Sequence, residues 1–202
     1  SMNACVGYSA GAALTSGGEN TVIGGYACLS QCQTGGANVA IGSYTLGAHT
    51  GSNTVAIGRS AMHNNTDGEY NTAIGYHSLY TNTQGNGYTA VGYRALNAAE
   101  PAENAGNSTA VGNLSGEDLS TGINCVFVGT NAGRNVTTGS YNTVLGAEAL
   151  DSQTTGEANT AVGYKALNAA NHADADYNVA VGYDSLSDLT EGLKNTAIGY
   201  VA

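Results

Sequence analysis

Residues 159–167 read Asn-Thr-Ala-Val-Gly-Tyr-Lys-Ala-Leu, and this stretch decides the fold because similar stretches recur along the whole chain. Residues 71–79 and 195–200 follow the same pattern. The central glycine, called the motif glycine below, stands at positions 7, 24, 42, 58, 75, 92, 112, 129, 146, 163, 182 and 199. Successive motif glycines are 16 to 20 residues apart, most often 17. Such self-similarity over 202 residues predicts a repeat protein rather than one or two ordinary domains.

The residues before each motif glycine predict a short β-strand. Counting from the glycine, position −1 is always aliphatic and position −2 is usually alanine, while position −3 is β-branched from the second copy onward. Alternation with β-branched residues on one face is typical of a strand. We predict that the −1 side chains are buried and that the −3 side chains are half-buried or hydrogen-bonded.

The residues after the motif glycine predict the rest of the coil. Position +4 is usually leucine, and Thr-Gly pairs such as Thr138-Gly139 signal a turn. One repeat is therefore expected to form two short strands and two turns. Asparagine recurs at position −4, where it either stacks as a ladder of side-chain amides or serves as a turn residue. Seventeen residues are too few for a helical repeat. The predicted fold class is all-β, a parallel β-solenoid of about twelve 17-residue coils.

The composition suggests that one chain alone is not enough. Glycine, alanine, asparagine and threonine make up about half of the sequence, with one phenylalanine and no tryptophan. Each coil carries two dependable large apolar residues, and burying one contributes about 1.5–3 kcal/mol. Ordering the backbone costs about 1–2 kcal/mol per residue. Further burial between chains would close this gap, so we expect an obligate homotrimeric fibre. Residues 1–202 form a single repeat domain, interpreted as part of a longer fibre protein, with Ser1-Met2 as a cloning remnant.

The repeat resembles a known family. Asn53-Thr54-Val55-Ala56-Ile57-Gly58 is similar to the head repeat of trimeric autotransporter adhesins, the YadA-like β-roll, and the longer motif at 71–79 resembles repeats of phage tail fibres and related bacterial trimeric fibres. The resemblance implies a left-handed parallel β-roll and a homotrimer. It also implies an extracellular location, on a cell surface or a virion fibre, and attachment to a receptor or glycan of a host or prey cell. The 17-residue repeats here are longer than those common in the autotransporter heads.

Charge and cysteine content exclude several functions. The net charge of −10 and the scattered arginines and lysines disfavour a nucleic-acid partner, because binding a phosphate backbone needs clustered basic residues. No apolar run is long enough to span a membrane, so no membrane insertion by this segment is expected. Cys28 and Cys32 either form a disulfide or are small buried residues. No catalytic constellation, metal site or cofactor motif is found, and we predict no enzymatic activity.

Two insertions in the repeat are candidate binding loops, since insertions in solenoids often map to binding faces. They cover residues 97–107 and 168–177 and carry several acidic and polar side chains. The candidate residues are Asn97, Glu100, Glu103, Asn171, His172, Asp174 and Asp176. Such groups suit a hard cation such as calcium, although the ligand spacing of known loops is absent and solvated acidic loops are the alternative.

A tyrosine column at position +1 is the second candidate. The residues proposed for binding are Tyr76, Tyr93, Tyr164 and Tyr183. Their rings could stack on sugars or cover the edge between neighbouring chains of the trimer.

We therefore expect a structural and adhesive fibre segment, a head or shaft, that attaches to a cell-surface or glycan target. One alternative is an ice-binding β-solenoid, because threonine recurs on flat strands. Another is a polysaccharide-active tailspike segment, which would need converging carboxylates near residues 100–103, 117–118 and 174–176.

Overall fold

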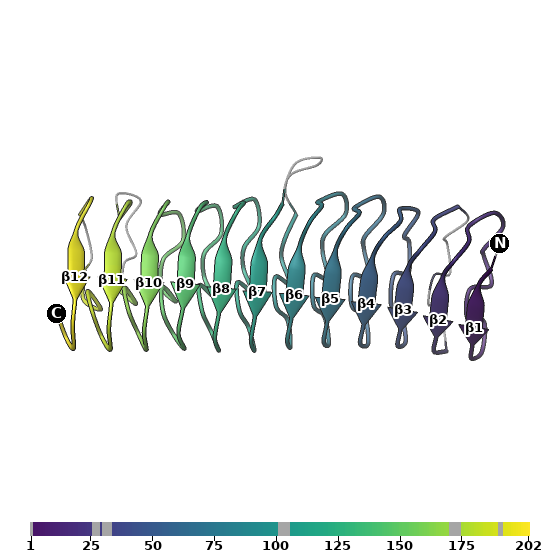
Figure 1. Cartoon of the computed structure of the whole chain (residues 1–202), viewed down its shortest axis with the longest axis horizontal. Coiled ribbons are helices and arrows are strands. Elements are labelled where there is room, and N and C mark those ends of the chain that lie inside the picture. The colour runs from purple at the N-terminus through teal and green to yellow at the C-terminus, as the bar shows by residue number, and fades with distance from the viewer. Residues whose placement is uncertain (1, 26–28, 30–33, 101–105, 170–174, 190–191) are drawn as a thin grey trace.

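The computed structural model shows a row of parallel strands, each followed by a turn-rich return (Figure 1). It describes residues 2–25, 29, 34–100, 106–169, 175–189 and 192–202. Within these ranges there is no helix. The chain advances from one end of the row to the other, so the molecule is elongated (Figure 1). The predicted all-β parallel β-solenoid is confirmed.

In the described residues, twelve strands of three residues each form one parallel sheet in sequence order. Equivalent motif positions pair, as in Val55 with Thr72, Ala56 with Ala73 and Ile57 with Ile74. Every strand therefore lies at positions −3 to −1, where the sequence predicted it. The strands are β1 (Ala4–Val6), β2 (Thr21–Ile23), β3 (Val39–Ile41), β4 (Val55–Ile57), β5 (Thr72–Ile74), β6 (Thr89–Val91), β7 (Thr109–Val111), β8 (Val126–Val128), β9 (Thr143–Leu145), β10 (Thr160–Val162), β11 (Val179–Val181) and β12 (Thr196–Ile198).

The predicted second strand of the repeat is wrong for the described residues, which form no strand between one motif glycine and the strand of the next repeat. After the motif glycine, positions +2 and +4 adopt left-handed backbone conformations, as His77 (φ 54°) and Leu79 (φ 50°) do. The N–H groups at +2 and +4 then point to opposite sides of the coil. The Arg94 N–H donates to the Tyr76 carbonyl of the preceding coil, and the Leu79 N–H donates to the Ala95 carbonyl of the following coil. The coils are thus hydrogen-bonded on this side as well, but without extended strand geometry.

The sequence-based assignment of the inner strand face is also wrong. From β2 to β11 the middle residue, at −2, is buried, while the residues at −1 and −3 are partly or fully exposed. Ala56 and Ala73 are fully buried, whereas Ile74 is 37% exposed. The expected half-burial of position −3 is confirmed for most repeats. The reason is size: the leucines at +4, such as Leu79, are fully buried and fill the thin coil, which leaves room for only a small side chain opposite.

The asparagines at −4 form a buried ladder. Asn38 Oδ1 accepts a hydrogen bond from the Thr54 N–H of the next coil, and Asn38 Nδ2 donates to the Gly51 carbonyl. Asn142 and Asn159 repeat the arrangement, since Asn142 Oδ1 accepts from the Asn159 N–H. The ladder interpretation is confirmed, with the difference that most of its bonds join an amide to the neighbouring backbone. These bonds satisfy polar groups that would be costly to bury alone.

Buried polar side chains also occur at position +7, where His49, Asn65 and Asn82 occupy three successive repeats. The Asn65 Nδ2 group lies 3.0 Å from His49 Nδ1, and Asn82 Nδ2 donates to Asn65 Oδ1 at 3.2 Å. His49 is fully buried, and its Nε2 atom has no hydrogen-bond partner. Burial therefore lowers the pKa of His49 to about 4, against opposing effects of Asp67 and of the Thr66 backbone. His49 is a neutral core residue that cannot easily accept a proton in the folded state.

This burial predicts an acid-sensitive contribution to stability. Above pH 6.5 neither the folded nor the unfolded state protonates His49, and its neutral form contributes fully. As the pH falls from 6.5 to about 4, only the unfolded state takes up the proton, so stability is lost over that window. The loss should reach about 3 kcal/mol. We would measure urea unfolding of the wild type and His49→Gln between pH 7 and pH 4, at one protein concentration.

Gln153 fills the same column, so glutamine is a suitable non-titrating replacement for His49. The difference in unfolding free energy between wild type and variant should move in favour of the variant by about 3 kcal/mol on acidification. A difference that does not change with pH would contradict the prediction.

Candidate functional site

The candidate loop residues are only partly described by the structure. Glu103, Asn171, His172 and Asp174 lie outside the described residues, as do Cys28 and Cys32. The remaining three lie on the coil framework. Glu100 is exposed and Glu100 Oε1 is 3.4 Å from Thr83 Oγ1, while the half-buried Asn97 accepts the Thr81 hydroxyl at its carbonyl. Asp176 Oδ1 accepts the Glu157 N–H at 2.7 Å. The Asp176 carboxylate thus links two neighbouring coils. Ligand binding by the two loop insertions stays a prediction.

The tyrosine column forms two separate ring stacks. Tyr76 and Tyr93 stack with centroids 5.6 Å apart and an angle of 9° between ring planes. Tyr164 and Tyr183 lie 5.2 Å apart, and Tyr183 continues onto Tyr200 at the same distance. Asn113, Thr130 and Ala147 interrupt the column between them. Because neighbouring rings cover one another's faces, the column presents mainly ring edges and hydroxyls rather than open platforms for a sugar face.

Histidines and further tyrosines extend the first stack, which the sequence did not predict. His77 lies 4.0 Å from the Tyr76 ring and 4.4 Å from Tyr80, and Tyr80 in turn stacks on His63 at 5.6 Å. The Arg59 guanidinium lies 5.7 Å from the centroid of Tyr76. Arg94 follows Tyr93 in the next coil. We call Arg59, His63, Tyr76, His77, Tyr80, Tyr93 and Arg94 together the basic aromatic patch.

These residues come from different motif positions, and this is why they were missed. Tyr76 is at +1, His77 at +2 and Tyr80 at +5, so no single column contains them. The turn conformations at +2 and +4 bring the +1, +2 and +5 side chains together on one side of the coil. A chart of neighbouring columns, rather than each column alone, would have shown the cluster.

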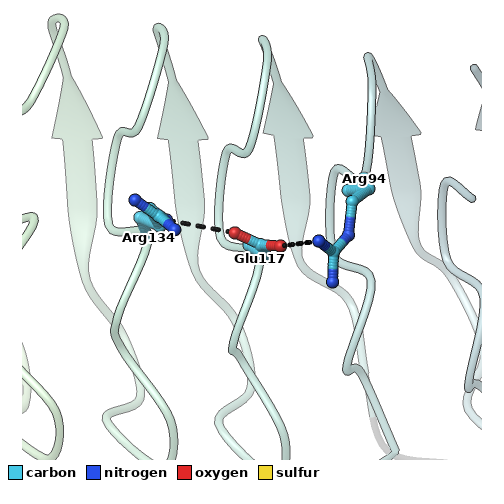
Figure 2. A network of polar contacts seen from close by, with 3 residues as sticks. All are labelled: Arg94, Glu117 and Arg134. Atoms are coloured by element: carbon cyan, nitrogen blue, oxygen red, sulfur yellow. Dashed lines mark hydrogen bonds and ion pairs between the residues drawn. The ribbon is translucent and has the colours of Figure 1, made fainter.

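An ion-pair network centred on the buried Glu117 includes Arg94 of the patch (Figure 2). The Glu117 side chain is only 5% exposed and accepts Nη1 of Arg94 and Nε of Arg134, each at 3.0 Å. The three residues follow β6, β7 and β8, so the network ties three successive coils together. Both oxygens of Glu117 are occupied by guanidinium groups, which argues against its use as a free acid or base.

The carboxylates nearby show no metal-binding arrangement. Burial raises the pKa of Asp118, with a further contribution from the negative charge of Glu117. Burial likewise raises the pKa of Asp151, whose Oδ1 has no hydrogen-bond partner. Across the ranges that the structure describes, no three histidine, cysteine, aspartate or glutamate side chains gather closely enough to hold a metal ion.

Comparison of this chain with models of known protein families, with curated proteins and with solved structures finds no match. In the part of the chain that is described, no helix is long and apolar enough to span a bilayer. The described residues present two outward surfaces with a distinct composition, the aliphatic face of the sheet and the face that carries the stacked rings.

Proposed function

We propose that the chain is a segment of an extracellular attachment fibre, a left-handed β-roll that assembles as a homotrimer and presents binding surfaces to a cell-surface or glycan target. The observation that carries the proposal is the outward face of the sheet. Its side chains at −1 are aliphatic in every repeat and are never fully buried in the single chain. Leu145 is 50% exposed and Ile198 is 72% exposed.

This aliphatic face extends along the whole row of strands, over about 50 Å at about 4.8 Å per strand. Contiguous exposed apolar patches of this extent are rare in monomers and mark interaction surfaces. The −1 and −3 columns of this face repeat in every copy and pair in register from strand to strand, so identical chains can pack against one another along it. Identical subunits commonly assemble in closed rings. The resemblance to trimeric fibre repeats favours three subunits.

Sedimentation and native mass spectrometry at micromolar concentration test the assembly. We expect a trimer for the wild type and loss of the trimer for Ile74→Asp, which places a charge at the centre of the aliphatic face. Thr138→Asp introduces the same charge on an exposed turn and should remain trimeric. A folded wild-type monomer, or a stable dimer, would overturn the proposed trimer.

Ice binding is the second candidate, and the orientation of the strands favours it. Threonine at −3 and an aliphatic residue at −1 both point outward, as in Thr143 and Leu145, and recur at the strand spacing. Valine interrupts the threonine column at Val55 and Val126. A measurable thermal hysteresis by a monomeric chain would favour this function over attachment, whereas a trimer without hysteresis would exclude it.

A further inference from the structure

The basic aromatic patch concentrates positive charge in an acidic protein. The chain has a net charge of −10, with five lysines and arginines and four histidines. Four of these nine basic residues, namely Arg59, His63, His77 and Arg94, belong to the patch. With histidines neutral, the patch residues carry two formal positive charges, at Arg59 and Arg94, in a chain of net charge −10.

The electrostatic environment of His77 shows the same concentration of charge. Partial burial lowers the pKa of His77, and Arg94, Arg59 and His63 lower it further by repelling its proton. Arg94 shares its charge with Glu117 through Nη1, whereas Arg59 forms no ion pair with any of the described carboxylates and lies over the Tyr76 ring. Like charges held together in this way are relieved when an anion binds.

The stacked rings add a second preference for anions. Tyr76, His77 and Tyr80 are nearly parallel, with interplanar angles of 5° and 16°, so their faces are turned toward one another. Their edges and polar atoms are left to face a ligand. Aromatic edges carry partial positive charge and attract oxygen atoms and anions. Tyrosine hydroxyls can in addition bond to ligand hydroxyl groups.

We propose that the basic aromatic patch binds a carboxylate-bearing polysaccharide, lying along the fibre axis with its carboxylates at Arg59 and Arg94. This inference rests on the proposed attachment function and names its ligand class. Arg59 and Arg94 belong to repeats two coils apart, which is about 10 Å along the axis. One sugar of an extended chain advances about as far as one coil, so a polymer of acidic sugars can place carboxylates at both arginines.

A ligand of much higher charge density fits less well. To bind nucleic acids or other densely charged polyanions, a protein of net charge −10 needs many clustered basic residues that offset the repulsion. Here the basic groups are few and are interleaved with tyrosine rings. A polysaccharide matches this composition, because its hydroxyls outnumber its carboxylates.

Binding of oligogalacturonate to the full chain, measured by calorimetry at low salt, tests the inference. We expect saturable binding that weakens with added salt and weakens about tenfold in Arg59→Gln. The methyl-esterified oligosaccharide, which lacks the negative charges, should bind at least tenfold more weakly. Lys194→Gln removes one positive charge from an exposed site far along the row of strands and should leave binding unchanged.

The pKa of His77, followed by NMR, provides a readout that does not depend on affinity alone. Its ring is surrounded by Arg59, His63 and Arg94 and stacks on Tyr76 and Tyr80. A bound carboxylate would offset the positive charges, so saturation with oligogalacturonate should raise this pKa. Adding the methyl ester at the same concentration should not.

The outcomes separate this inference from the proposed fibre. Equal binding of the acid and its ester, unchanged binding by Arg59→Gln, or tighter binding of polyphosphate than of oligogalacturonate would overturn the ligand class. Each could occur in an intact trimer, and a monomer that still bound oligogalacturonate through Arg59 would overturn only the trimer.

Discussion

Replacing Gly58 with alanine is expected to cost about 4 kcal/mol of stability, because the backbone and the packing both require glycine there. Gly58 has φ 130°, a region that other residues rarely adopt. A Cβ atom added to it would lie 2.6 Å from the carbonyl oxygen of Gly75, the motif glycine of the next coil. Neither residue can move away easily, since the backbone N–H groups of Gly58 and Gly75 are both hydrogen-bonded to the preceding coil. Urea unfolding at one protein concentration measures the loss.

Gly25→Ala is the matched control. Gly25 directly follows another motif glycine, but its φ is not in the left-handed region and an added Cβ would meet no atom within 4 Å. Its replacement should change stability by no more than about 0.5 kcal/mol. Similar losses for the two variants would show that the motif glycine is not required for its conformation.

Phe127→Ala is the second change with a large expected effect, a loss of about 3–5 kcal/mol. Phe127 occupies position −2, where most repeats have alanine, and is fully buried. Its ring fills the space left by Gly116 and Gly133, which replace the usual leucine at +4 in two successive repeats. Truncation would leave a cavity that the rigid coils cannot close.

The exchange between these positions can be tested directly. Gly133→Leu alone should be destabilising, because its side chain would overlap the Phe127 ring. The double variant Phe127→Ala/Gly133→Leu restores the usual pair of alanine and leucine and should recover much of the stability lost in each single variant. The double-mutant cycle should therefore be strongly non-additive. Leucine can adopt the backbone of Gly133 (φ 58°), since Leu150 has φ 50° at the equivalent position. Additive losses would show that the two sites are not coupled by packing.

The sequence predicted the strands well because the period and the β-branched columns are strong local signals. All twelve strands end at the residue before a motif glycine. The face that points inward was assigned wrongly. Alternation separates two faces, but hydrophobicity alone favoured Ile57 over Ala56 for the interior, and only the opposing leucines show that the coil is too thin for isoleucine.

The second half of each repeat could not be predicted from residue types. Leu79, His77 and Arg94 have positive φ, a conformation that their side chains do not signal. The ring stacks depend on this geometry, so the sequence identified Tyr76 and Tyr93 as a column but not their contacts with His77, Tyr80 and His63. The loop candidates Asn97, Glu100 and Asp176 were placed on the framework without any sign of a shared ligand site.

Each strand contacts only the strands of the repeats before and after it, and the asparagine ladder likewise bonds only between neighbours. The number of repeats therefore sets the length of the molecule, and it can change without altering the contacts within any repeat. Inserting or deleting one whole repeat changes the length of the molecule by about 4.8 Å, and the repeats that become neighbours still pair through the same strand positions. Recombination between similar repeats can thus move the basic aromatic patch nearer to or farther from the other tyrosine stack without changing the residues of either. The number of repeats encoded between two surface features therefore sets the distance between them.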